Sequence, residues 1–163
     1  MNIKITKHFL LYNGYKLKCC IGKSGIIRKK KEGDLATPEG NFKIGMLYYR
    51  KDRVKIFKCK IKKKEITKNM GWCDDIRSKK YNREIILPFK YSAEKLYRKD
   101  KIYDLLINIK YNYKPTKKAK GSAIFLHVAH SKYKSTRGCV SISKKNFLKI
   151  LPLINSKTKI EIN

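Results

Sequence analysis

The sequence predicts a mainly β domain with one or two short helices, and three features carry that prediction. Asn13-Gly14 separates the apolar segments Phe9–Tyr12 and 15–21, which is the pattern of two strands joined by a type I′ turn. The two densest apolar segments, 103–111 and 123–128, have the length and composition of buried, central strands. Helical spacing of apolar residues is confined to short segments, so strands are expected to dominate.

The rest of the N-terminal half alternates between loop and strand. Glycine and proline residues interrupt the periodicity between 23 and 40, which predicts a loop. Strand-like segments follow at 41–49 and near 54–61. The lysine-rich run 60–64 predicts a charged strand edge or a hairpin tip.

The C-terminal half contains both predicted helices. The sequence predicts, in order, a loop over 70–83, a short helix over 92–98 capped by Ser92, a helix over 144–154 capped by Ser143, and a closing strand over 158–162. Phe147, Leu148, Leu151 and Ile154 recur at helical spacing in the longer helix. The sequence contains no internal repeat or linker, so residues 1–163 are expected to form one domain.

The charge composition is strongly basic. With 42 Lys and Arg residues against 12 Asp and Glu, the formal net charge is +30, which invites a nucleic-acid interpretation. Most of these cations are lysines spread over the whole chain, whereas base-reading sites favour arginine. We therefore expect a solvated basic surface with non-specific attraction to anionic polymer or lipid, and no specific nucleic-acid site. A non-catalytic basic module remains the alternative.

The five cysteines, at positions 19, 20, 59, 73 and 139, form no C-x-x-C pair. An odd number without that spacing argues against a disulfide framework and a standard zinc module. His127, His130 and Cys139 do not have the spacing of a usual ligand set either, so we predict no metal and no other cofactor. No apolar run approaches the roughly 20 residues of a membrane span, which predicts a protein that is not integral to a membrane. The N-terminus does not have the pattern of a signal peptide.

One segment has the residues required for thiol catalysis. An apolar strand leads to His127, a polar loop follows, and Thr136-Arg137-Gly138-Cys139 precedes a second short apolar segment. Two adjacent strands would bring the imidazole to the thiol, and Gly138 would turn the backbone so that its N–H faces a developing oxyanion. Arg137 is expected to lower the pKa of the thiol. Spacing alone leaves open that His127 and Cys139 are ordinary core residues.

Two ordered motifs resemble the L,D-transpeptidase catalytic domain of the YkuD type. The family has a His followed after ten to twenty residues by Ser/Thr-x-Gly-Cys, which matches His127 and Thr136-Arg137-Gly138-Cys139. Its other loop, GD-x-x-TP-x-G-x-F, matches residues 33–42. The resemblance covers nearly the whole chain. The sequence is most similar to a branch of the family that consists of a minimal domain. It implies a β-sandwich of mixed sheets.

The resemblance also implies an activity. Cys139 would attack a peptide bond of a peptidoglycan stem, and His127 would act as general base and acid. A second stem's amine would then resolve the thioester and form a cross-link or exchange the terminal residue. Water as the acceptor, giving an L,D-carboxypeptidase or endopeptidase, is the alternative. Such a substrate places the protein in the periplasm or cell envelope, although cytoplasmic residence or a non-standard export route stays open. Arg137, Val128 and Ser141 depart from the usual family residues, so the resemblance does not extend to the substrate clamp.

The remaining site assignments are weaker. Thr136, Arg137, Trp72 and Tyr81 are expected to contact substrate, the last two as walls of the cleft. Asp74 or Asp75 is expected to pair with an amine of the stem, or else to form a simple turn. Residues 33–42 are expected to be structural, with Phe42 entering the core. His130 would face away from His127 on an extended chain. Among the other thiols, Cys73 is expected to be exposed and the rest to lie in the core.

Overall fold

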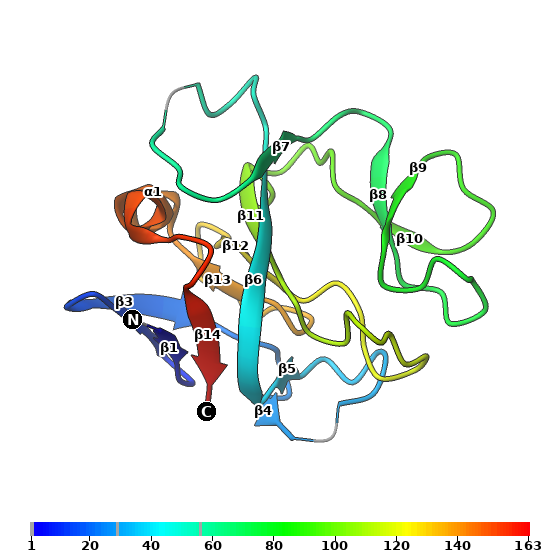
Figure 1. The fold of residues 1–163 in the computed structure, drawn as a ribbon, viewed down its shortest axis with the longest axis horizontal. Coiled ribbons are helices and arrows are strands. Elements are labelled where there is room, and N and C mark those ends of the chain that lie inside the picture. The colour runs from blue at the N-terminus through cyan, green and yellow to red at the C-terminus, as the bar shows by residue number, and fades with distance from the viewer. Residues whose placement is uncertain (1, 29, 56) are drawn as a thin grey trace.

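A closed ring of β-strands forms the main body of the protein. The computed structural model describes residues 2–28, 30–55 and 57–163. Eight strands follow one another around the ring, and the last pairs with the first (Figure 1). In order they are β11 (Leu105–Ile109), β12 (Phe125–Val128), β13 (Val140–Ile142), β3 (Tyr15–Cys20), β2 (Phe9–Tyr12), β1 (Ile3–Ile5), β14 (Lys159–Ile162) and β6 (Gly40–Tyr49). Parallel and antiparallel pairs both occur, so the predicted mainly β fold with mixed sheets is confirmed, with the main sheet closed into a barrel-like arrangement.

The period-two alternation of strand side chains divides the core into two clusters. In β12, Leu126 and Val128 face the interior of the ring, where they meet the aliphatic side chains of the other strands. Phe125 faces the outside, packed in a second cluster with Trp72, and by the same alternation His127 shares its face. The outer face of β12 is therefore covered by protein rather than by water.

A smaller sheet forms this outer cover. It consists of β10 (Ala93–Lys95), β8 (Met70–Cys73) and β9 (Glu84–Ile86), and in Figure 1 it lies on the side of the molecule away from the N-terminal strands. The Trp72 ring packs edge-to-face on Phe125 with 5.2 Å between centroids, and Met70 and Leu96 join the same cluster. The short β7 (Lys63–Glu65) extends the main sheet beside β6, and β4 (Ile26–Ile27) pairs with β5 (Thr37–Pro38).

Two predicted local signals are confirmed. Asn13 and Gly14 have φ angles of 49° and 80°, as a type I′ turn between β2 and β3 requires. Helix α1 (Lys144–Ile150) begins after Ser143, whose hydroxyl accepts a hydrogen bond from Asn146 N–H at 3.2 Å. The chain then tightens into the 3₁₀ helix η1 (Leu151–Leu153), because Pro152 has no N–H to continue the α-helical pattern.

The structure corrects three predicted segments. Residues 92–98 form no helix; they contain β10, whose residues pair with β8, and the Ser92 N–H donates to Asp75 instead of Ser92 acting as a cap. Residues 70–83 are not all loop, since β8 begins them. The described residues of 54–61 form no strand, and Ile56 lies outside the described residues. None of the helices in the described part of the chain is long and apolar enough to cross a membrane.

Candidate active site

Adjacent parallel strands place Cys139 and His127 on one face of the sheet. β12 pairs with β13 so that Leu126 lies opposite Val140 and His127 opposite Ser141. Cys139 immediately precedes β13 and lies beside Phe125, whose N–H is 3.4 Å from the Cys139 Sγ. The thiol and the imidazole therefore occupy diagonal positions on the outer face, as expected from two strands joined by a loop.

The Cys139 thiol is buried and protonated at rest. Its Sγ–H donates to the Ala123 carbonyl oxygen at 3.1 Å, and the side chain is 9% exposed. Burial, with a further contribution from Glu94, raises the pKa of Cys139 to about 12, while the Phe125 N–H and Lys30 lower it. The expectation that Arg137 depresses the thiol pKa is wrong, because burial dominates and the nearby cation is Lys30.

The His127 imidazole is also buried and neutral. Its Nδ1 lies 2.9 Å from the Val128 carbonyl oxygen, so Nδ1 carries the proton and Nε2 is left as the basic nitrogen. Burial lowers the pKa of His127 to about 4, against the opposing effect of hydrogen bonds to the Val128 and Ile102 backbone. Within the described structure no hydrogen bond joins His127 to Cys139. Tyr103 packs edge-on against His127 at 5.3 Å between ring centroids.

Gly138 shapes the turn that carries the thiol. Its φ of +134° is a conformation that L side chains rarely adopt, and a Cβ there would lie 2.8 Å from the Ala36 oxygen. Thr136 closes the turn, because its hydroxyl accepts from the Gly138 N–H at 3.1 Å and donates to the Cys139 carbonyl at 2.5 Å. The Gly138 N–H is thus occupied by Thr136 in this resting arrangement.

The loop at 33–42 holds this turn from below. Thr37 donates its hydroxyl to the Gly138 carbonyl at 2.9 Å and accepts from the Gly22 N–H at 2.8 Å. Asp34 accepts from the Lys30 Nζ at 2.5 Å and from the Ala36 N–H at 3.0 Å. The loop therefore fixes both the Gly138 turn and the buried Lys30, which agrees with the structural role expected for it.

The sequence comparison identifies the family of this arrangement. Residues 3–162 match the family YkuD, L,D-transpeptidase catalytic domain. The chain belongs to this family. Membership makes it an L,D-transpeptidase-type enzyme of peptidoglycan, with peptidoglycan peptides as the substrate class. No curated protein matches the sequence.

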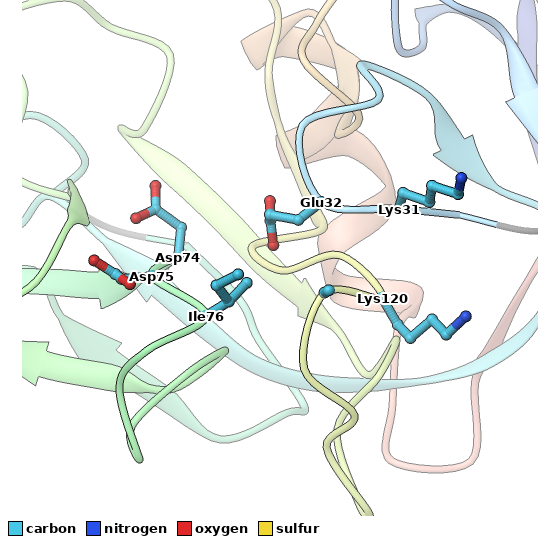
Figure 2. Close-up of a pocket in the computed structure, with 7 residues that line it drawn as sticks. Lys31, Glu32, Asp74, Asp75, Ile76 and Lys120 are labelled. Atoms are coloured by element: carbon cyan, nitrogen blue, oxygen red, sulfur yellow. The ribbon is translucent and has the colours of Figure 1, made fainter.

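Three carboxylates surround a cavity in this YkuD domain. The cavity has a volume of about 630 Å³ and is lined by Lys31, Glu32, Asp74, Asp75, Ile76, Ala119 and Lys120. Figure 2 shows the Lys31 and Lys120 side chains pointing away from the Asp74, Asp75 and Glu32 carboxylates. Asp75 accepts from the Arg77 guanidinium at 2.6 and 2.9 Å, which holds the pKa of Asp75 well below its usual range. Asp74 Oδ1 is buried without a hydrogen-bond partner among the described residues.

Trp72 and Tyr81 are buried supports of the YkuD site rather than exposed cleft walls. Each is 3% exposed. The Trp72 Nε1–H donates to the Asn82 side chain at 2.9 Å, and Tyr81 donates to the Glu32 carboxylate and accepts from the Gly121 N–H. Asn82 also accepts from the Ala123 N–H at 3.1 Å, next to the carbonyl that holds the Cys139 thiol. One edge of Trp72 still reaches a surface groove.

Sequence reasoning missed Lys30, Tyr103 and Glu94 around the YkuD-type thiol. Tyr103 donates its hydroxyl to Glu94 at 2.5 Å, and burial raises the pKa of both side chains. No local pattern distinguishes these residues from their neighbours, because they reach the thiol through tertiary contacts. Arg137 is exposed and lowers the pKa of Glu94.

The other candidate groups lie apart from the thiol. Cys73 is fully buried, so its expected exposure is wrong: β8 carries it into the outer layer. Cys19 is buried, whereas Cys20 and Cys59 are partly exposed. His130 is exposed, with its ring accepting from the Lys132 N–H. No group of three or more His, Cys, Asp or Glu residues in the described ranges is arranged to hold a metal ion.

Proposed function

We propose that the protein is a cysteine-dependent L,D-transpeptidase that forms a thioester between Cys139 and a peptidoglycan stem peptide, then forms a cross-link or exchanges the terminal residue. The supporting observation is the position of Cys139. It follows a glycine turn held by Thr136 and Thr37, on the same sheet face as His127, in a chain matched along almost its entire length by the family.

The reaction begins from a neutral thiol and a neutral imidazole. His127 takes the Cys139 proton on Nε2 while Sγ attacks the carbonyl carbon of the stem peptide. The tetrahedral intermediate collapses when the carbon–nitrogen bond breaks, and His127 returns its proton to the leaving amine. The thioester then remains. The amine of a second stem attacks it, an amide forms, and the proton released by that amine returns to Cys139 through His127.

The buried resting state requires substrate to activate the pair. When substrate binds, the thiol exchanges its hydrogen bond with the Ala123 carbonyl for one with His127 Nε2. The Gly138 N–H exchanges Thr136 for the developing oxyanion, a donor typically worth about 3–4 kcal/mol. Lys30 adds positive charge beneath the turn, where negative charge develops on sulfur and oxygen.

The acidic cavity is proposed to receive an ammonium group of the stem peptide. Asp74 is the candidate partner, because its Oδ1 is unpaired while both oxygens of Asp75 are bound by Arg77. Thr136 and the exposed Arg137 flank the thiol and are proposed to contact the peptide; Trp72 and Tyr81 act by supporting these surfaces. We infer the cell envelope as the site of action, since peptidoglycan lies there.

The deciding experiment uses purified muropeptides. Wild type, Cys139→Ser and His127→Ala proteins are incubated with them, and the products are analysed by mass. We expect an adduct on Cys139 and dimeric or exchanged products with wild type only. Shortened stems without dimers would assign water as the acceptor. Unchanged muropeptides with no adduct on wild type would contradict the proposal.

A further inference from the structure

A second cavity lies on the outer face of the main sheet, apart from the acidic cavity. It has a volume of about 890 Å³, within the range of ligand sites. We call it the basic groove. Its floor comes from β6, β8 and β11, and its rim from the segments 60–62, 79–84 and 110–113. The lining residues are Ile44, Gly45, Met46, Tyr48, Lys60, Ile61, Lys62, Trp72, Lys79, Lys80, Arg83, Glu84, Asn108, Lys110, Tyr113 and Ser156.

The basic groove has an excess of cations without acidic partners. Six basic side chains line it, and none lies within ion-pair distance of a carboxylate in the described part of the chain. The one acidic lining residue, Glu84, is already bound by Lys64 at 2.5 Å and by the Tyr48 hydroxyl at 2.9 Å. The groove is therefore charged to attract an anion.

The floor of the groove also carries an amide that makes no hydrogen bond within the described part of the protein. Asn108 is 7% exposed, and its side chain makes no hydrogen bond with another described residue. Gly45 opposite it has no side chain; a Cβ there would lie 3.3 Å from the Asn108 Cβ and 3.5 Å from its Nδ2. The Asn108 amide therefore opens into the groove, where it can both donate to and accept from a bound ligand.

The aromatic residues of the groove do not offer faces for nucleic-acid bases. Trp72 and Tyr48 are 3% and 5% exposed and pack against each other edge-to-face. The ring of Tyr113 is covered by the Arg83 guanidinium at 4.6 Å. Binding of single-stranded nucleic acid depends on open aromatic platforms, so this lining favours an anion with amide groups and without bases.

The groove lies close to the candidate nucleophile. Asn108 pairs with Phe125 across β11 and β12, and the Phe125 N–H contacts the Cys139 Sγ on its other side. Two strand spacings separate Asn108 from Cys139, which is about 10 Å or roughly three residues of extended peptide. This is the straight-line separation, and the buried Phe125, with Trp72 packed on its ring, lies between the two residues.

We propose that the basic groove binds the carboxylate-bearing part of a peptidoglycan stem peptide, with the lysines and Arg83 contacting carboxylates and Asn108 contacting the peptide backbone. This inference rests on the proposed function for the identity of the peptide. The groove itself is defined by its own charges and its unpaired amide.

Trp72 provides the measurement, because it is the only tryptophan and lines the groove. Its fluorescence is titrated in Cys139→Ser protein with uncross-linked disaccharide-tetrapeptides, and with the same fragments after their carboxyl groups are amidated. The test variant carries Lys79→Gln, Lys80→Gln and Lys110→Gln. The control carries Lys4→Gln, Lys7→Gln and Lys145→Gln, three exposed lysines outside the groove, with the same loss of charge.

We expect the test variant to bind the native fragment at least roughly tenfold more weakly, and the control to change its affinity less than about twofold. Amidated fragment should bind wild-type groove as weakly as native fragment binds the test variant. Asn108→Leu should weaken both fragments. Equal losses in test and control variants, or equal binding of amidated fragment, would overturn the proposal. A single-stranded oligonucleotide that binds more tightly, with the same dependence on the groove lysines, would overturn it in favour of nucleic acid.

The two proposals fail separately. Groove-dependent binding in Cys139→Ser protein, together with no adduct on wild-type Cys139, would remove the transpeptidase proposal and leave the groove. An adduct on Cys139 whose formation is unaffected by the three groove substitutions, with no groove-dependent binding, would remove the groove and leave the enzyme.

Discussion

At the scale of single residues, burial sets the protonation state of both candidate catalytic groups. The same outer layer that covers Cys139 covers His127, so the thiol pKa is raised and the imidazole pKa is lowered. Each shift favours the neutral form, and together they oppose proton transfer from sulfur to nitrogen until substrate rearranges the site. An idle thiol is thereby protected from alkylation and oxidation.

The buried His127 imidazole predicts that the free energy of unfolding falls as the pH is lowered below about 6.5. The pKa of His127 is about 4 in the folded protein, below the ordinary histidine value of about 6.5, so the unfolded chain gains the proton first as the pH falls. This contribution is present above about pH 6.5 and is lost as the pH falls toward 4, by about 3 kcal/mol in total. His127→Gln should therefore lose less unfolding free energy than wild type between about pH 7 and pH 4, as measured by urea denaturation.

His130→Gln is the matched control, because His130 is exposed. It should reproduce the wild-type difference between the two pH values. If the unfolding free energy of His127→Gln fell as steeply with decreasing pH as that of wild type, groups other than His127 would be responsible for the loss.

Gly138 predicts a second effect at a single position. Gly138→Ala must accommodate a Cβ 2.8 Å from the Ala36 oxygen at a φ of +134°, so we expect a loss of about 2–3 kcal/mol in unfolding free energy and no acylation of Cys139. Gly25→Ala is the control that carries backbone strain without a steric clash, since Gly25 has a φ of +82° and no atom lies within 4 Å of its Cβ position. It should cost about 1 kcal/mol and retain acylation. Denaturation midpoints and intact mass after incubation with substrate measure both. Acylation of Gly138→Ala at the wild-type rate would contradict the role of the turn.

At the scale of elements, the hydroxyl of Thr37 joins two loops distant in sequence. Thr37→Val would leave the Gly22 N–H and the Gly138 carbonyl without their partner, which should cost about 2–4 kcal/mol. A looser turn should expose Cys139, so its alkylation by a small reagent becomes faster while its acylation by stem peptide becomes slower. Thr37→Ser keeps the hydroxyl and should keep both rates. Mass mapping distinguishes Cys139 from the other four thiols. Alkylation that is unchanged or slower in Thr37→Val would contradict this role, because a loosened turn must expose the buried thiol.

Elements specified by local chemistry were predictable, and elements specified by partners were not. Asn13-Gly14 and Ser143 act within a few residues of themselves, and both were placed correctly from the sequence. Ser92 and the residues after it have the composition of a capped helix, yet they form β10 because β8 presents an edge to pair with. For the same reason the His127 and Cys139 strands were foreseen, while Lys30 and Glu94 beside the thiol were not.

At the scale of the whole molecule, the ring is closed by pairings between the two ends of the chain. β14 lies between β1 and β6, and its Ile160 lies opposite Ile3 of β1 on one side and Phe42 of β6 on the other. The last strand of the chain therefore completes a sheet that the first strand begins. In Figure 1 the two termini lie close together on one side of the ring. The alternation of apolar residues predicted the strands, but it carries no information on which strands become neighbours.

The net charge of +30 predicts how the whole fold responds to salt. Mutual repulsion among so many cations destabilises the compact state. Salt screens this repulsion, which acts over about 30 Å at 0.01 M salt but only over about 8 Å at 0.15 M. The free energy of unfolding should therefore rise with sodium chloride over this range. Lys4→Gln, Lys7→Gln and Lys145→Gln together should raise it at low salt and flatten the dependence. Urea denaturation at several salt concentrations measures both. Stability that falls with salt would mean that paired charges such as Lys30–Asp34 and Lys144–Asp104 outweigh the repulsion.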